Sequence, residues 1–596
     1  MSRVRSVERT RFRGLLQLAI REVGDQALRR PHLLLMKSLT SGCEARFSSG
    51  EVVNQDWSQI HPSTILESSF VAWLVKSHKA HEHFCAQKVA IFGAFLSGML
   101  DLSSVSSAVG VSLVSCRITC CSDFSKCNLS EVNLSGSRIN GLKINGGKLG
   151  GLDLSGGVQS IGELYLIGLE VATSINFSQS NFCAAPNNDK VISADGVRVG
   201  RDIFFRGTTV ANGEVRLVGA NVSGSVSCDG ARFENERGVA LAITSATISG
   251  SLHLESGFVA IGAVVLNGCS IERYLRLMFA RFENPKEVKG PADRAYCLQA
   301  QVARIEGALT IQKCVFKGPV DFSSISIGTL LDEEESWPEE IELGNIKINE
   351  VSFRAPCNMR SRLRLLARVP MEEAFDAQPY IEFAKTLSSQ GMEADALRLM
   401  ERYWWRRIGL NIRGRVKRIS RWILDPSGKC SHDCQTHPYD RFTVVVSMIL
   451  GVLFVGNGYA RWRCLMWMML LIMFGTLSFG HEGLGAISRY DSSNIPCEAD
   501  HVEHDSAVGA KEKFLARPCI TIQGASNGNV SLNVNHFNAF LFSVDSVLPV
   551  VDLRYAKKWV PVNNTARMIV LPVLIGGGWL LVSLFAISFT GVMRKI

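Results

Sequence analysis

A stretch with a period of five constrains the fold of this 596-residue chain more than any other feature. From Phe124 to Leu154, every fifth residue is large and apolar: Phe124, Leu129, Leu134, Ile139, Ile144, Leu149 and Leu154. The residue two places earlier is mostly small, and Ser, Asn and Gly fill the other positions. A period of five fits neither an α-helix, at about 3.6, nor a flat strand, at about 2. The repeat predicts a coil that turns a corner every few residues, with one large and one small side chain pointing inward on each side.

The repeat continues beyond Leu154 with a different spacing. Pairs of apolar residues separated by one position recur, mostly every 11 or 12 residues, from Leu164/Leu166 through Val191/Ser193 to Val320/Phe322. We expect each pair to form a short strand with two inward side chains. Gly224, Gly250 and Gly307 precede such pairs, and we expect them at corners that need backbone freedom. The acidic text at 332–340 is expected to be a loop.

The text "CNLSEVNLSGSRINGLKINGGKLGGLDLSGG" resembles the pentapeptide-repeat family of right-handed β-solenoids. The resemblance implies a mainly β fold, a right-handed pentapeptide-type β-solenoid, here at 88–355. Because a terminal coil exposes its core and unpaired backbone, we expect a helical cap at 1–87. An α-helical hairpin with a basic linker is expected at 356–440, and a helical transmembrane domain at 441–596.

Two apolar stripes with helical spacing follow the solenoid, on either side of Gly391. They resemble a single helix-turn-helix repeat of the tetratricopeptide kind, which we expect to dock on the end of the solenoid. The segment from Arg402 to Arg421 then contains eight Lys or Arg and no acid. Because apolar segments typical of membrane spans follow, this basic segment indicates anionic lipid rather than nucleic acid as a partner.

Three runs lack charge: 442–460, 464–480 and 568–593. A membrane span takes about 20 apolar residues, with about 17 tolerated. Arg461 and Arg463 separate the first two runs, and the positive-inside rule favours two spans, 464–480 and 568–593, over three. We therefore predict a multi-pass protein of the inner (cell) membrane with the solenoid in the cytoplasm. The loop 481–566 is then external, where Cys497 and Cys519 are candidates for a disulfide.

The end of that loop carries an apolar helical pattern from Phe537 to Leu548. A short helix between two spans resembles the layout of two-helix cation-channel pore domains. The resemblance implies a pore loop at Pro549, Val550, Val551 and Asp552, but this text lacks the glycines that let filter carbonyls point inward. We predict a pore-like shell retained for anchoring or signalling, in which Asp552 forms a charge ring if subunits assemble as a homo-oligomer.

The text "GNGYARWRCLMWMM" and the C-terminal half together resemble a bacterial membrane-bound family often labelled "membrane-associated oxidoreductase". The residues do not support redox chemistry, because no G-x-G-x-x-G, C-x-x-C or phosphate-loop motif is present. We predict no cofactor and no catalytic residue, and whether the chain is an enzyme stays open.

One cluster has metal-ligand chemistry: Cys430, His432, Cys434 and His437. Thiolates and imidazoles suit Zn²⁺, but four ligands within eight residues strain a tetrahedral shell, which favours an ordinary polar loop. Cys127, Cys228 and Cys314 occupy inward solenoid positions and are expected to be reduced core residues.

These features together predict a membrane-anchored β-solenoid scaffold with a protein partner along the solenoid and the lipid bilayer as its second partner. The alternatives are a channel-like oligomer gated by the solenoid and the membrane-associated oxidoreductase.

Overall fold

The structure is a computed structural model that describes residues 2–48, 62–352 without 187, 208 and 286–294, 359–369, 377–406 without 404, 462–480, 487–489, 537–561 without 549 and 551, and 566–589. The chain divides into two units, Met1–Leu399 and Met400–Ile596, each of which is described by itself.

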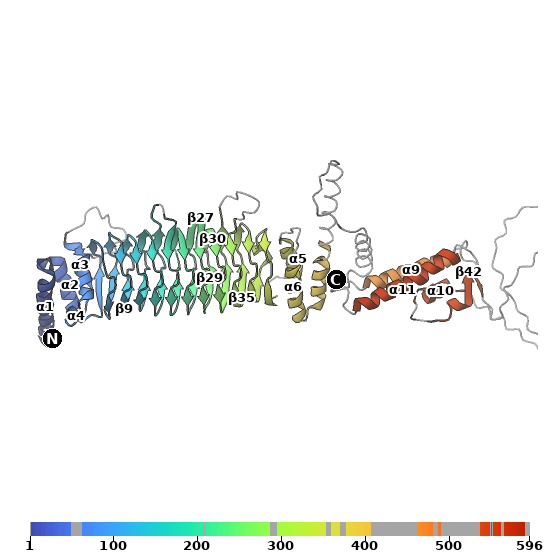
Figure 1. Ribbon diagram of the computed structural model, residues 1–596, viewed down its shortest axis with the longest axis horizontal. Helices are drawn as coiled ribbons and strands as arrows, with labels where there is room; N and C mark the ends of the chain where they lie inside the picture. Colours follow the sequence, from blue (N-terminus) through green and yellow to red (C-terminus); the bar gives the residue numbers. More distant parts are fainter. Residues whose placement is uncertain are drawn as a thin grey trace, which may run out of the picture. The chain divides into compact units, whose positions relative to one another are not determined.

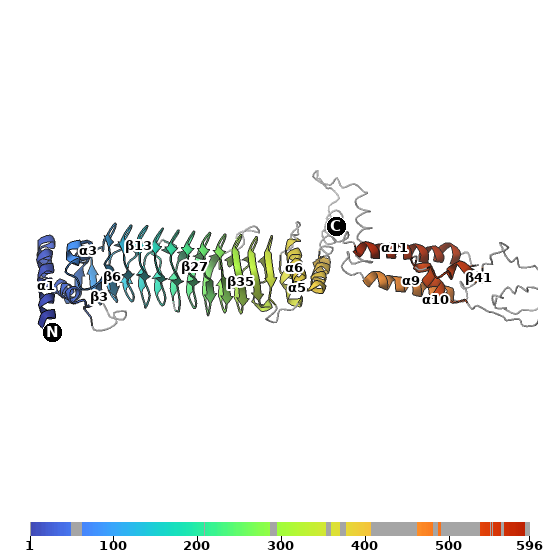
Figure 2. The ribbon, with the colours of Figure 1, turned by 90° about the horizontal axis from the view of Figure 1, so that it is seen from below.

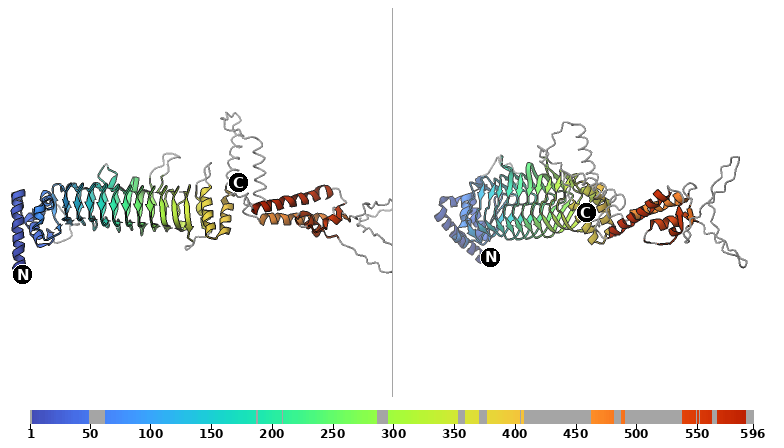
Figure 3. Two further views of the ribbon diagram at one scale, coloured as in Figure 1. Left: turned by 60° about the horizontal axis from the view of Figure 1, so that its bottom comes forward. Right: turned by 45° about the vertical axis from the view of Figure 1, so that its right-hand side comes forward.

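The first unit contains a parallel β-solenoid of about 11 turns (Figure 1). In the period-five stretch, Leu129 pairs with Leu149 and Val132 with Leu152, so one coil takes 20 residues and has four sides of five. All strand pairs between coils are parallel, as stacking of successive turns requires, and the turns follow one another along the unit (Figure 3). The predicted β-solenoid is confirmed, and its right-handedness stays a prediction.

The coils form four faces, each a ladder of strands from successive turns. The first face contains β5 (Ser106–Ser107), β9 (Asn128–Leu129), β13 (Lys148–Leu149), β17 (Glu170–Val171), β21 (Arg198–Val199), β25 (Asn221–Val222), β28 (Thr247–Ile248), β31 (Ser270–Ile271) and the starts of β35 (Arg304–Gln312), β38 (Ser326–Asp332) and β40 (Lys347–Val351). The second face contains β1 (Ala45–Arg46), β3 (Lys88–Phe92), β6 (Gly110–Val114), β10 (Val132–Asn133), β14 (Leu152–Asp153), β18 (Ile175–Asn176), β22 (Ile203–Phe204), β26 (Val226–Ser227), β29 (Leu252–Glu255), β32 (Tyr274–Met278) and the ends of β35, β38 and β40.

The other two faces close the coil. The third contains β2 (Ile65–Glu67), β4 (Phe95–Ser97), β7 (Arg117–Ile118), β11 (Arg138–Ile139), β15 (Gln159–Ile161), β19 (Asn181–Cys183), β23 (Val210–Asn212), the starts of β27 (Arg232–Ala242) and β30 (Val259–Val265), β33 (Arg281–Glu283) and β36 (Val315–Lys317). The fourth contains β8 (Ser122–Asp123), β12 (Leu142–Lys143), β16 (Leu164–Tyr165), β20 (Lys190–Ser193), β24 (Glu214–Arg216), the ends of β27 and β30, β34 (Leu298–Gln299), β37 (Val320–Asp321) and β39 (Ile341–Glu342).

The core lies inside the coil, where the sequence pattern predicts it. The seven large residues from Phe124 to Leu154 are at most 3% exposed. The predicted pair Val191/Ser193 is wrong by one residue, because Ile192 is the partner of Leu164 and Ala194 follows it into the core. A register shift between Lys190 and Ile192 moves the strand by one position, which the apolar spacing alone does not reveal.

The corner glycines have a steric function that differs from the one predicted. Gly224, Gly250 and Gly307 do not have positive φ values. Instead, a Cβ on Gly307 would lie 1.9 Å from the carbonyl oxygen of Arg273 in the preceding coil. Adjacent coils therefore approach too closely at this corner for any side chain, and backbone freedom is not the reason for glycine there.

Helices cover the N-terminal end of the solenoid (Figures 1 and 2): α1 (Ser2–Val23), α2 (Arg30–Ser41), α3 (Ser68–Lys76) and α4 (His78–His81), with 3₁₀ turns at Asp25–Leu28 and Pro62–Thr64. Phe70 and Leu74 of α3 are buried, as a capping helix requires. The segment just before α3, Ile65–Glu67, forms β2 and pairs with β4.

The C-terminal end is closed by α5 (Met359–Ala367) and α6 (Gln378–Ser389). The acidic text is not only a loop, because Asp332 ends β38 and lies opposite Ile311 at an inward position, before a 3₁₀ turn at Glu334–Ser336. The Arg362 guanidinium of α5 donates to both oxygens of that carboxylate at 2.6 Å. A charge on α5 thus neutralises a charge inside the last coils.

Side chains of α6 and of its C-cap residue, Gln390, satisfy the backbone of the last strand, β40. Thr386 Oγ1 donates to the Ile348 carbonyl at 2.7 Å, and Gln390 Nε2 donates to the Val351 carbonyl at 3.0 Å. The α6 stripe containing Tyr380, Phe383 and Leu387 is buried. A side-chain amide and a hydroxyl therefore supply donors that a further strand would otherwise provide.

The second unit contains α9 (Trp462–Gly480), α10 (Ala539–Val547) and α11 (Leu571–Phe589), with a π-helical turn at Ala566–Val570 and a 3₁₀ turn at Ala556–Lys558. The three helices pack side by side (Figure 2), and β41 (Ile487–Arg489) pairs antiparallel with β42 (Trp559–Pro561). The expected span 464–480 falls on α9, and 568–589 of the second falls on the π-helical turn and α11. Its last residues, 590–593, lie outside the described residues. The run 442–460 lies outside the described residues.

Candidate binding groove and membrane unit

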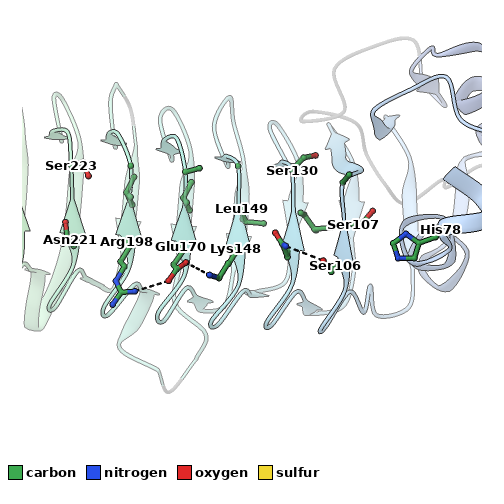
Figure 4. Close-up of a pocket in the computed structure, with 18 residues that line it drawn as sticks. His78, Ser106, Ser107, Ser130, Lys148, Leu149, Glu170, Arg198, Asn221 and Ser223 are labelled. Atoms are coloured by element: carbon green, nitrogen blue, oxygen red, sulfur yellow. Dashed lines mark hydrogen bonds and ion pairs between the residues drawn. The ribbon is translucent and has the colours of Figure 1, made fainter. Parts of the chain in front are cut away.

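A shallow groove of about 990 Å³ runs along the first face of the solenoid (Figure 4). It is lined by six consecutive turns, which contribute an outward column of Ser106, Asn128, Lys148, Glu170, Arg198 and Asn221. Each strand here has two residues, and its second residue points into the core, so the first must face solvent. We refer to this cavity as the first-face groove.

The floor of the first-face groove is a column of small corner residues: Ala108, Ser130, Gly150, Ala172, Gly200 and Ser223. A Cβ on Gly150 would lie 2.0 Å from the Ser130 carbonyl oxygen, and one on Gly200 would lie 2.2 Å from that of Ala172. The same close approach that lets the coils stack therefore keeps this corner free of large side chains. The result is a depression that follows the solenoid axis.

The middle of the groove carries a row of charges from three successive turns. Glu170 lies between Lys148, at 3.0 Å, and Arg198, at 3.1 Å (Figure 4). The hydrogen bond from Lys148, followed by the contribution of Arg198, holds the pKa of the Glu170 carboxyl below its ordinary value. The Lys148 and Arg198 side chains are 66% and 71% exposed. Solvent screens such pairs, so they add little to stability and stay available to a partner.

One end of the groove is formed partly by the N-terminal helices. His78, from α4 of the N-terminal helices, contributes to the wall at one end (Figure 4). At the same end, Asn128 Nδ2 donates to Ser106 Oγ at 3.4 Å. The groove therefore extends from the capping helices over the solenoid within one unit of the chain.

Most of the predicted site residues lie outside the described part of the chain. These are Cys430, His432, Cys434, His437, Cys497, Cys519, Pro549 and Val551. The structure thus describes neither the metal-like cluster nor the expected disulfide, and both stay predictions.

The other two pore-loop residues are described and lie at the surface. Val550 is 78% exposed. The Asp552 carboxylate accepts from Lys557 Nζ at 2.8 Å and from the Arg554 backbone N–H at 3.0 Å. These hydrogen bonds, that of Lys557 first, hold the pKa of Asp552 below its ordinary value. Asp552 is therefore engaged by its own chain.

Sequence reasoning missed Asp545, which organises this loop. Its carboxylate accepts from the backbone N–H groups of Leu553, Tyr555 and Ala556 at 2.8, 2.9 and 2.7 Å. An acid inside an otherwise apolar helix was the available signal, because a charge there needs a partner.

The packing face of α10 is not the predicted stripe. Phe540 is 55% exposed, whereas Phe542 and Val547 are buried. A Cβ on Gly578 of α11 would lie 2.0 Å from the Val547 carbonyl oxygen, and one on Gly475 of α9 would lie 2.6 Å from Ser543 Oγ. Glycines on both long helices thus allow α10 to pack closely against them, as small residues do at helix contacts in membranes.

Two helical segments, Arg463–Gly480 and Met568–Ala586, are long and apolar enough to cross a membrane. Only 22% of each is buried in the fold. Met469 is 73% exposed, Leu477 65% and Trp579 58%. A large apolar surface of α9 and α11 therefore has no cover among the described residues.

No protein-family model and no curated protein matches this chain.

Proposed function

We propose that this chain is a membrane-tethered β-solenoid scaffold whose first-face groove binds an extended segment of a partner protein. The observation that carries the proposal is the groove itself, which continues over six turns rather than closing into a compact pocket. A long, shallow site fits an extended chain better than a small molecule, because small-molecule sites enclose most of their ligand.

The chemistry of the groove favours a peptide over other polymers. Its charged row alternates in sign, with Glu170 between two cations, whereas a nucleic-acid surface needs a continuous basic patch. The turns that carry the row are fixed by backbone pairing on both sides. A rigid, preformed site loses little conformational entropy on binding.

The tether is assigned to α9 and α11 in the second unit. Their exposed apolar surface supports a lipid environment, since a core helix of a soluble domain is mostly covered. Arg463 at the start of α9 pairs with Glu401 at 2.7 Å, which places a basic group at one helix end. The basic segment from Arg402 to Arg421 precedes this helix end. We propose that both helices span the inner membrane of the cell and that this end faces the cytoplasm.

The scaffold is preferred over the two alternatives for physical reasons. A channel-like oligomer needs a loop whose carbonyls can point into a shared pore, and the loop at 549–552 lacks the glycines that allow this. An oxidoreductase needs a cofactor-binding motif, and the sequence supplies none.

The groove is tested by site-specific photo-crosslinking in cells that express the full chain. A photoreactive residue at Asn128, in the groove wall, is expected to yield one discrete crosslinked protein. Filling the floor with Ala172→Trp should lower that yield about tenfold, the effect of losing about 1.4 kcal/mol of binding free energy. Ala172 is exposed, so the substitution leaves the core intact.

The matched control is Ile161→Trp, which enlarges a residue that is 57% exposed on the third face. It should leave the crosslink unchanged. Absence of a discrete product, or a product insensitive to Ala172→Trp, would refute groove binding.

A further inference from the structure

A second cluster of functional groups lies on the second face, away from the first-face groove. Ser227 of β26 pairs with His253 of β29 in the next turn. Asp229 and Glu255 each follow two residues later, so the three groups Asp229, His253 and Glu255 come from two adjacent coils. One ligand atom from each lies within 4.8 Å of the other two.

Hydrogen bonds orient all three groups. His253 Nδ1 lies 3.0 Å from Glu255 Oε1. Ser227 Oγ donates to Asp229 Oδ2 at 2.6 Å. The side chains are partly withdrawn from solvent, with Asp229 30%, His253 21% and Glu255 17% exposed.

One acceptor in the cluster lacks a donor. Asp229 Oδ1 is shielded from solvent and has no hydrogen-bond partner among the described residues. A shielded carboxylate oxygen without a donor is unfavourable unless a cation or another group satisfies it. This oxygen is an independent indication of a missing ligand.

The charge balance also leaves room for a cation. Arg206 pairs with the cluster: its Nε lies 3.7 Å from Asp229 Oδ2 and donates to Ser227 Oγ at 2.9 Å. It offsets one of the two carboxylates and contacts Oδ2, not Oδ1. Arg276, the strand partner of His253 in the following turn, places its guanidinium over the Tyr274 ring at 5.2 Å.

We propose that Asp229, His253 and Glu255 bind a divalent transition-metal ion, with Zn²⁺ as the best match. Imidazole nitrogen with carboxylate oxygen is a ligand set for Zn²⁺, and water completes the shell. Ca²⁺ and Mg²⁺ fit less well because they require six or more oxygen ligands or near-octahedral oxygen geometry. The ion would join two neighbouring coils and stabilise the folded solenoid by mass action.

The test is calorimetric titration of the full chain in detergent with ZnCl₂. Because Cys430 and Cys434 also have zinc-ligand chemistry, the titrations use the Cys430→Ser/Cys434→Ser chain as the reference. His253→Ala and Asp229→Asn are each expected to weaken one Zn²⁺ site at least about tenfold, which is about 1.4 kcal/mol. MgCl₂ should give no comparable site.

The matched control is Glu214→Gln, which removes a carboxylate that pairs with Arg216 on the fourth face of the same solenoid. It should leave the zinc titration unchanged. Thermal unfolding with and without ZnCl₂ provides a second readout, since only the reference and control chains should be stabilised. Titrations that do not change with His253→Ala and Asp229→Asn would overturn the metal site, and they would leave the groove proposal untouched.

Discussion

Replacing Arg362 with methionine is expected to lower the free energy of unfolding of the first unit by about 3–5 kcal/mol, because it leaves the Asp332 carboxylate buried and unpaired. Asp332 is 3% exposed and Arg362 is 1% exposed. Two guanidinium hydrogen bonds and one from Trp337 Nε1, each at 2.6 Å, hold the carboxylate. The Arg362→Met change removes two of the three.

Two further variants separate this mechanism from general damage to α5. Asp332→Leu/Arg362→Met removes both charges, and we expect the pair to recover most of the lost stability, since apolar replacement of a buried ion pair is often neutral. Arg364→Met, on the same helix, breaks a pair whose arginine is 68% exposed, and should lower stability by about 1 kcal/mol or less. Urea unfolding followed by circular dichroism measures all three. If Arg362→Met lowers the free energy of unfolding as little as Arg364→Met does, the buried pair with Asp332 does not hold α5 on the last coil.

The second large effect is expected at Gly578 in α11. Gly578→Ala would place a methyl group 2.0 Å from the Val547 carbonyl oxygen of α10. Backbone cannot rotate away as a flexible side chain can, so α10 must shift, at about 1–3 kcal/mol. The variant should therefore unfold at lower SDS mole fraction in mixed micelles.

Gly576, two residues earlier on the same helix, supplies the control. A Cβ there meets nothing within 4 Å. Gly576→Ala should be neutral or stabilising by up to about 1 kcal/mol, the difference in helix propensity. If the two alanine variants behave alike, α10 does not pack against α11 at this glycine.

The period-five stretch allowed the solenoid and its inward residues to be predicted, because each corner buries its own side chain locally. The sequence did not predict which residues of successive coils lie next to each other on one face. Val171 pairs with Val199, 28 positions later, whereas Val199 pairs with Val222, 23 positions later. The residues that line the first-face groove can therefore be predicted only when these unequal coil lengths are known. The zinc cluster was missed for the same reason, since Asp229 and His253 lie one irregular turn apart.

The sequence predicted that the ends of the solenoid are capped, but not which contacts form the C-terminal cap. A cap was expected because open coils expose their edge. The acidic text was interpreted as a loop because inward positions are ordinarily apolar, and nothing near Asp332 in sequence reveals its partner 30 residues away. In the second unit, the spacing predicted helix α10 but not its packing face, which is determined by glycines on α9 and α11.

The central claim, a solenoid scaffold held at a membrane by α9 and α11, is tested most directly by washing membranes from cells that express the full chain with alkaline carbonate. Lipid-embedded helices resist this wash, whereas peripheral contacts and basic surfaces release. We expect the chain to stay in the membrane pellet and to enter solution only with detergent. Recovery of the intact chain in the aqueous carbonate fraction would contradict the tether and leave the apolar faces of α9 and α11 to be covered by protein.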